Sequence, residues 1–133
     1  MLFRSRMQHS LDRLGIRMLW KVEICGELEA VRGEPAQQVL RIAQECLTNV
    51  IRHADASVVG VVLRFVPETN SLVLEVRDNG RGIGRSKAGR TGGKGLESMR
   101  RRAQLIGGEL LISSKASAGT RVRLTLPLTE NPV

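Results

Sequence analysis

The sequence has few aromatic residues and few residues that commonly bind metals. It contains no tyrosine, one tryptophan and two phenylalanines. Proteins that bind single-stranded nucleic acid stack bases on several such rings, so this class of protein is disfavoured. The two cysteines, Cys25 and Cys46, have no CxxC spacing, and the only histidines are His9 and His53. These numbers and spacings argue against a structural zinc site and against a disulfide framework, and they favour a cytoplasmic protein with reduced thiols.

Long hydrophobic runs are also missing, although the composition is that of a globular protein. No apolar run approaches the ~20 residues that cross a membrane. The chain has 133 residues, 41% of them hydrophobic, which suffices for one domain with an adequate core. Lysine and arginine outnumber aspartate and glutamate by 21 to 13, which gives a formal net charge of +8. This surplus favours a polyanionic partner: nucleic acid, a membrane surface or the phosphates of a nucleotide.

The glycine-rich segments lack the signatures of the commonest nucleotide-binding loops. A Walker loop ending at Lys94 would need glycine at position 88, which is Ala88. The dinucleotide pattern GxGxxG fails because Arg85 and Ser98 stand where its last glycine would be. The order of expected strands and helices is not a regular βαβ series either.

The segment 72–84 combines a strand pattern with a polar, glycine-rich end. Residues 72–76 alternate as in a strand, and the sequence then continues as DNGRGIG. Three glycines at alternate positions weaken a strand but suit a sharp turn or a close approach to a ligand. The carboxylate of Asp78 at this turn is a natural acceptor for a ligand amino group. An ordinary hairpin turn is the alternative.

The segment 36–54 is the strongest helix pattern, and Pro35 suits its first turn. Its apolar residues fall in one arc and its polar residues Glu45, Asn49, Arg52 and His53 on the opposite side. A solvated polar face is the usual meaning of such a pattern. However, asparagine is a poor residue in mid-helix. Glutamate and asparagine four residues apart also present two oxygens to one point, which suits a hydrated magnesium ion. The apolar arc comprises Val39, Ala43, Cys46, Leu47, Val50 and Ala54.

The remaining patterns predict a mixture of helices and strands around a cationic loop. Basic residues 100–102 fall on the last predicted helix, where a solvated face is favoured over a role in nucleotide or partner binding. The expected segments are a helix at 2–14, strands at 16–24, 57–66, 109–114 and 120–128, a glycine-rich loop at 85–95 and a helix at 96–106.

Four motifs follow one another along the chain: ECLTNVIRHA (45–54), DNGRGIG (78–84), GGKGLESMRRRAQLIGG (92–108) and GTRVRLTLPL (119–128). Together they resemble the ATP-binding domain of the GHKL superfamily, which includes histidine kinases, gyrase-type topoisomerases, Hsp90 chaperones and MutL. Within it the chain is most similar to the catalytic domain of sensor histidine kinases that phosphorylate NarL-type response regulators. The resemblance begins near Ile16 and covers the rest of the chain.

The resemblance implies a two-layer α/β sandwich of the Bergerat type, with helices on one face of a mixed, mostly antiparallel sheet. ATP would lie between the helix 36–54 and a lid at 85–94, which would be mobile without nucleotide. Residues 16–133 would form the ATP-binding catalytic domain. Residues 1–15 would be a helix or linker that remains from an upstream region.

The resemblance also implies roles for individual residues. Glu45 would be the general base or would position water, and Asn49 would bind ATP and the Mg²⁺ ion. Asp78 would accept a hydrogen bond from the exocyclic amine of adenine. The other implied ATP-binding residues are His53 near the phosphates, Gly80 and Gly82 beside the adenine, Gly93, Lys94, Gly95 and Leu96 at the phosphates, and Thr120 beside Asp78.

The implied function is transfer of the ATP γ-phosphate to a histidine on a dimerisation domain, for relay to a response regulator. That domain does not precede residue 16, and His9 lacks the acidic neighbour that this subgroup places after its phosphoacceptor. We therefore expect a fragment that is monomeric, does not autophosphorylate and touches neither nucleic acid nor membrane. The parent protein could be anchored in the inner membrane. The alternative is a stand-alone GHKL regulatory module such as an anti-sigma-factor serine kinase.

Overall fold

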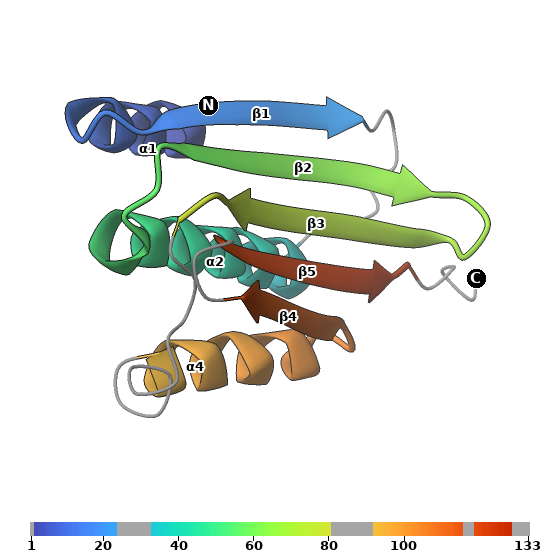
Figure 1. Ribbon diagram of the computed structural model, residues 1–133. Helices are drawn as coiled ribbons and strands as arrows, with labels where there is room; N and C mark the ends of the chain where they lie inside the picture. Colours follow the sequence, from blue (N-terminus) through green and yellow to red (C-terminus); the bar gives the residue numbers. More distant parts are fainter. Residues whose placement is uncertain (1, 24–32, 81–91, 116–118, 129–133) are drawn as a thin grey trace.

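The protein folds as two layers, a five-stranded sheet with helices behind it (Figure 1). The computed structural model describes residues 2–23, 33–80, 92–115 and 119–128. Within these ranges, no helix is long and apolar enough to cross a membrane. The elements in chain order are α1 (Leu2–Arg13), β1 (Arg17–Glu23), α2 (Glu34–Asn49), η2 (Val50–Ala54), β2 (Val58–Val66), β3 (Ser71–Asp78), α4 (Gly92–Leu105), β4 (Glu109–Lys115) and β5 (Gly119–Pro127).

The strands lie in the order β1-β2-β3-β5-β4. Only the pair β1 and β2 is parallel, and the other three pairs are antiparallel. In Figure 1 α2 lies behind the sheet, and α4 packs against α2 and β4 at the lower edge. The expected sandwich, with helices on one face of a mixed and mostly antiparallel sheet, is confirmed.

The core lies between the sheet and α2, because both elements are apolar on the sides that meet. Alternate side chains of β2, β3 and β5 point toward the helices and are buried. The predicted apolar arc of α2 is confirmed from Val39 to Val50, and Ile42 and Leu47 within this helix are completely buried. The buried strand residues on this side are Val59, Val61, Leu72, Leu74, Val76, Val122, Leu124 and Leu126.

The first helix also contributes to this core. Leu11 of α1 is fully buried and clusters with Ile16 and Met18 at the start of the sheet. Gly15, with a φ of 73°, allows the chain to turn sharply from α1 into β1. The proposed division between residues 15 and 16 stays a prediction, and α1 packs on the domain that follows it.

Two helix boundaries differ from those expected. The predicted helix 36–54 consists of α2 followed by a π-helical turn, η2, which Asp55 ends in the left-handed conformation with a φ of 52°. A π turn rotates the residues after Asn49 away from the positions that a regular helix would give them. The last predicted helix begins at Gly92, four residues before Leu96, because tertiary packing of α4 on α2 outweighs the low helix propensity of glycine.

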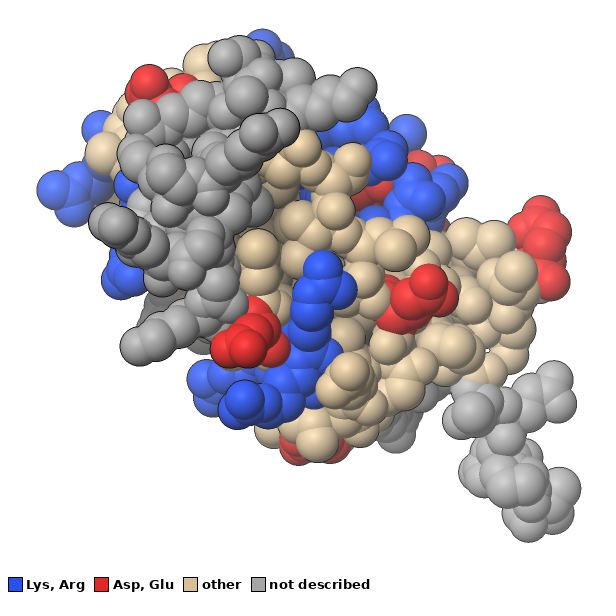
Figure 2. Space-filling model, turned by 60° about the horizontal axis from the view of Figure 1, so that its bottom comes forward, with Lys and Arg blue, Asp and Glu red and all other residues tan. Residues whose placement is uncertain are grey.

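The basic run at the end of α4 divides into exposed and bound residues. Arg100 and Arg101 are exposed, whereas Arg102 is half-buried and donates from Nη1 to Oε1 of Gln38 at 3.0 Å. Gln38 in turn donates to Glu34 at 2.7 Å, so Arg102 helps to join α4 to the start of α2. Figure 2, in which the lower edge of Figure 1 is turned forward, shows basic side chains over this side of the molecule.

The buried face of α2 can be tested with two leucines of that helix. Leu47→Ala should lower the free energy of unfolding by about 2–5 kcal/mol, because it removes buried atoms and leaves a cavity. Leu40 is 52% exposed, so Leu40→Ala serves as the control and should cost less than about 1 kcal/mol. Urea unfolding followed by circular dichroism measures both values, and equal losses would contradict the assignment of the buried face.

Candidate functional site

The site is centred on Asp78, the last residue of β3. Asp78 pairs with Val59 of β2 on one side and with Thr120 of β5 on the other. Strand alternation places its side chain on the same face as Val76, toward the helices. Its exposed fraction is only 8%, so a carboxylate lies at the edge of the apolar core.

Two backbone amides hold this carboxylate, and burial acts against them. The Gly80 N–H donates to Oδ1 of Asp78 at 2.8 Å, and the Thr120 amide also favours the charged form. Loss of hydration outweighs both amides, so burial raises the pKa of Asp78 above its ordinary value of 3.8. A buried carboxylate of this kind can accept one more hydrogen bond from a ligand donor, as the sequence predicted.

Asn79 and Gly119 fix the backbone around Asp78, a region that we call the Asp78 corner. The sequence analysis assigned no role to either residue. Oδ1 of Asn79 accepts from the amides of Ser57 and Val58 at 3.0 and 2.9 Å, which ties the turn after β3 to the start of β2. Gly119 has a φ of 89°, and a Cβ there would lie 2.0 Å from the Asp78 carbonyl oxygen. Only glycine fits at this position. The motif GT at 119–120 could have indicated a constrained turn. Its contact with Asp78 could not be inferred, because the two residues lie far apart in the sequence.

Thr120 stands beside Asp78 as expected. Its Oγ1 lies 3.1 Å from Oγ of Ser114 on β4, and either hydroxyl can donate. The side chain is half-buried, and its strand position is fixed by the pairing with Asp78. Thr120 therefore connects the Asp78 corner to the hydroxyl of Ser114.

The polar residues Glu45 and Asn49 belong to α2, which lies in the helical layer that packs against the sheet near Asp78. Glu45 and Asn49 are half-buried one helical turn apart, and neither side chain has a hydrogen-bond or ion-pair partner among the described residues. Within the described part of the chain, no side chain or backbone group occupies the oxygens of Glu45 and Asn49. Arg52 is exposed, and His53 lies in the π turn, although its side chain is outside the described part of the chain.

Cys46 connects the helix residues to the strand residues of the site. Its Sγ lies 3.6 Å from Sδ of Met99, in the buried contact between α2 and α4. Burial raises the pKa of this thiol from 9.0 to about 12, and the charges of Glu45 and Asp78 act in the same direction. Both carboxylates are thus within electrostatic range of one sulfur, while the thiol itself stays protonated and structural.

The start of α4 supplies the other boundary of the site. Gly93, Lys94 and Gly95 lie in its first turn, where backbone N–H groups have no partner within the helix and the dipole favours an anion. Leu96 is partly buried and packs against the core. Gly82 and the lid residues 85–91 lie outside the described residues. The arrangement can hold a ligand that has a hydrogen-bond donor at one end and negative charge at the other.

The cost of burying Asp78 leads to a prediction about stability. Its pKa is raised on folding, so between pH 3.8 and the raised value the folded chain keeps a proton that the unfolded chain releases. Stability therefore falls as the pH rises through that window. At pH 7 the charged form is the costly one, so Asp78→Asn should raise the free energy of unfolding by about 1 kcal/mol or more.

Urea unfolding at pH 7 and near pH 4 measures this gain, which should shrink at the lower pH because a larger share of Asp78 is then protonated. Glu68 is exposed in the turn between β2 and β3, so Glu68→Gln is a suitable control and should have little effect at either pH. A less stable Asp78→Asn variant at pH 7 would contradict the burial argument.

Known proteins similar to this chain include two sensor histidine kinases and a nitrate/nitrite sensor protein. The sensor histidine kinase YxjM of Bacillus subtilis is 38% identical over 126 residues, 94% of this chain and 27% of YxjM. The oxygen sensor histidine kinase NreB of Staphylococcus carnosus is 36% identical over 92 residues, 69% of this chain and 26% of NreB. The nitrate/nitrite sensor protein NarQ of Escherichia coli is 34% identical over 128 residues, 95% of this chain and 22% of NarQ. The chain thus spans about a quarter of the length of these relatives.

Solved structures share the fold. The blue-light activated histidine kinase EL346 of Erythrobacter litoralis superposes with a TM-score of 0.78 at 26% identity, over 95% of this chain and 39% of that chain. The histidine kinase AdeS of Acinetobacter baumannii, at 14% identity, shows the fold alone, with a TM-score of 0.72 over 96% of this chain and 62% of that chain. Residues 34–130 match the family model of these ATPases. Because that match covers both α2 and the strands around Asp78, the chain belongs to the family of histidine kinase-, DNA gyrase B- and HSP90-like ATPases.

Proposed function

We propose that this chain is the ATP-binding catalytic domain of a sensor histidine kinase. It would deliver the γ-phosphate of ATP to a histidine on a dimerisation domain, which passes the phosphate to a response regulator. The observation that carries the proposal is the similarity to YxjM, NreB and NarQ, each at least 34% identical. Family membership alone implies ATP binding. The kinase relatives narrow this to phosphoryl transfer and do not favour a stand-alone serine kinase.

In this proposal the Asp78 corner binds adenine. The free lone pairs of the buried carboxylate would accept from the exocyclic amine, and Thr120 would support the same edge of the base. Gly80 has no side chain to block the base and already orients the carboxylate through its amide. Gly82 would have the same open backbone beside the ring. Guanine carries a carbonyl where adenine carries the amine. The carboxylate of Asp78 would then face another acceptor, so guanine nucleotides should bind more weakly.

The start of α4 would bind the phosphates. The unpaired amides at the start of α4, including those of Gly93 and Lys94, and the dipole of a 14-residue helix favour an anion there. Gly95 and Leu96 complete this first turn. Lys94 would add a charge-assisted contact, and His53 would approach the phosphates from the π turn of α2. The helix holds its backbone amides in place before a phosphate binds, so they would stabilise charge that develops during transfer without a large reorganisation.

The residues on α2 fit a magnesium ion. Asn49 would be its ligand, because its amide oxygen is half-buried and has no partner among the described residues. No group of three or more His, Cys, Asp or Glu side chains that could hold a metal ion occurs within the described ranges, and magnesium does not need one, since it keeps several waters. Bound magnesium would neutralise phosphate charge. Glu45 would hold a water or accept a proton one helical turn away.

Asn49→Ala should therefore weaken binding of magnesium-ATP by about tenfold or more, the loss that follows disturbance of a metal site. It should weaken binding of ADP measured in EDTA much less, because the adenine corner remains intact. Gln44→Ala is the control, since this exposed residue lies on the same helix away from the site. Calorimetry measures all four affinities. An equal loss with and without metal would remove Asn49 from the metal site.

A chimera tests the proposed reaction. The whole chain, including α1 with its buried Leu11, would replace the corresponding region of YxjM, and the product would be incubated with γ-labelled ATP and magnesium. The histidine ring nitrogen attacks the γ-phosphorus and ADP leaves, so the label should be acid-labile and base-stable. The same chimera with Asp78→Asn should bind no ATP and carry no label.

Acid-stable label on serine would favour the anti-sigma-factor type of kinase, and a chimera that binds ATP but carries no label would contradict the proposal. The isolated chain should be monomeric, bind ATP and remain unlabelled, because the proposed phosphoacceptor belongs to another domain. We place the domain in the cytoplasm, where ATP and response regulators occur, with any membrane anchor in the rest of the parent protein. Neither nucleic acid nor the membrane itself is among its proposed partners.

A further inference from the structure

The sheet carries a hollow whose central residues, on the face away from the helices, have no role in the proposed kinase function, although Asp78 and Thr120 also line it. Strand pairing aligns one residue from every strand in a row across this face. A hollow of about 610 Å³ lies over this row, and all five residues line it. In the order β1-β2-β3-β5-β4 the row is Leu19, Gly60, Arg77, Arg121 and Ser113.

Gly60 gives the hollow its depth. It lies in the middle of β2, between Leu19 and Arg77, and it has no side chain to fill the row. A Cβ at this position would meet only the carbonyl oxygen of Arg77, at 3.9 Å. Close packing therefore does not require glycine here. Val58 and Val62 on either side are half-buried and form apolar walls.

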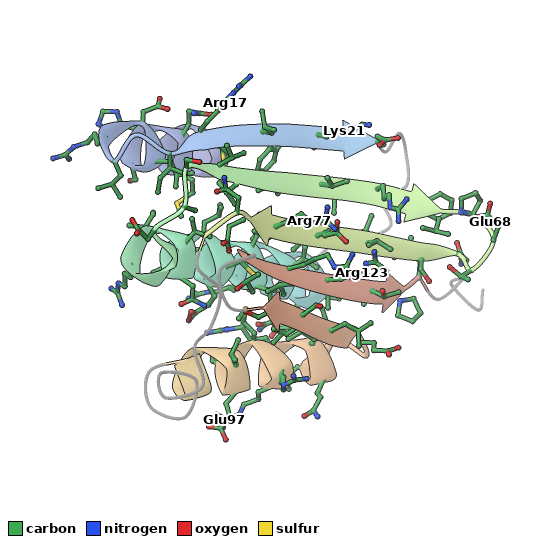
Figure 3. All side chains as sticks on the ribbon, viewed as in Figure 1. Arg17, Lys21, Glu68, Arg77, Glu97 and Arg123 are labelled. Carbon is green, nitrogen blue, oxygen red and sulfur yellow. The ribbon has the colours of Figure 1, made fainter. Side chains whose placement is uncertain are left out.

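Two arginines face each other at the centre of this row. Arg77 and Arg121 are directly opposite in the antiparallel pair β3–β5, and neither has a hydrogen bond or ion pair within the described ranges. In the next row Glu75 is bound to Arg123, with Nη2 of the arginine 3.0 Å from Oε1. Glu75 therefore does not neutralise the arginine pair. Figure 3 shows Arg77 and Arg123 on strands of the face turned to the viewer, opposite to the helices.

Like charges directly opposite on a sheet destabilise it, so this pair costs free energy unless an anion lies between the two guanidinium groups. Two planar guanidinium groups suit carboxylates, which they can bind in a bidentate manner. Exposed apolar side chains stand in the same face: Leu19 is 50% and Leu111 is 55% exposed. Arginine at the centre with apolar neighbours is typical of protein interfaces.

We propose that this groove, defined as the row from Leu19 to Ser113, binds an acidic segment of a partner protein. Carboxylates of that segment would pair with Arg77 and Arg121, and its apolar side chains would cover Leu19 and the valines of β2. A nucleic acid is less suited, because the hollow has no aromatic side chain on which a base could stack. Strand alternation directs Arg77 and Arg121 to the opposite face from the Asp78 carboxylate. The hollow is also lined by Asp78 and Thr120, so its end adjoins the proposed adenine site.

Fluorescence anisotropy with a labelled peptide of alternating glutamate and leucine tests this proposal at physiological salt. The matched peptide has glutamine in place of every glutamate and should bind at least about tenfold more weakly. The variant R77E/R121E should lower the affinity for the acidic peptide by about tenfold or more. The control R100E/R101E makes the same change of charge on the exposed side of α4 and should lower it less than about twofold.

Several outcomes would overturn the proposal. Equal losses in the two double variants would show that only the net charge matters, and equal binding of the two peptides would show that carboxylates are not recognised. Failure of the acidic peptide to bind would exclude the proposed partner. Tighter binding of single-stranded oligothymidine or of anionic phospholipid vesicles through Arg77 and Arg121 would assign the groove to another class of partner.

Stability provides a second readout that does not depend on the probe. R77Q/R121Q removes the repulsion without adding new charge, so it should unfold at a higher temperature than the wild type and still bind the acidic peptide more weakly. Arginines with a purely structural role would lower the unfolding temperature when replaced. ATP affinity should stay unchanged in R77Q/R121Q, which separates failure of this inference from failure of the proposed kinase function.

Discussion

The burial of the Asp78 carboxylate is the constraint on which the site depends. Burial raises its pKa, and the amides of Gly80 and Thr120 offset only part of the lost hydration. Gly119 must be glycine because any side chain there would collide with the Asp78 backbone. The ends of β3 and β5 thus surround a carboxylate whose burial lowers the free energy of unfolding. A costly carboxylate of this kind is retained where a ligand donor binds it, and carboxyl groups with perturbed pKa values therefore indicate functional sites.

Contiguous sequence patterns predicted most of the fold and the position of Asp78 at the end of a strand. Alternating apolar residues identified β3, and the apolar arc predicted four of the buried residues of α2 but not Gln38 or Ile42. Both patterns depend on the geometry of one element. Asp78 was identified for the same reason: a carboxylate that directly follows a strand and precedes glycines is a local signal. The two-layer arrangement followed from the resemblance to a family, since the order of strands in a sheet is not encoded locally.

Features that depend on distant partners could not be predicted in this way. Asn79 is an ordinary turn residue until β2 supplies two amides to its side chain, and Gly119 is an ordinary turn glycine until Asp78 lies against it. The π turn after Asn49 and the early start of α4 are also tertiary effects. In both places the packing between helices and sheet prevails over intrinsic propensity, so periodicity alone gives the wrong boundary.

Strand alternation gives the sheet two faces with different chemistry, and adjacent residues serve opposite faces. Asp78 and Thr120 form one pair of the β3–β5 ladder, and Arg77 and Arg121 form the next. The pKa of Asp78 depends on burial and two amides, with no arginine among its causes, although Arg77 is its neighbour in the chain. The two proposed sites therefore share β3 and β5 but use different side chains: Arg77 and Arg121 for an acidic segment, Asp78 and Thr120 for ATP. Because Asp78 and Thr120 also line the hollow, the two proposed sites adjoin one another at the end of these strands.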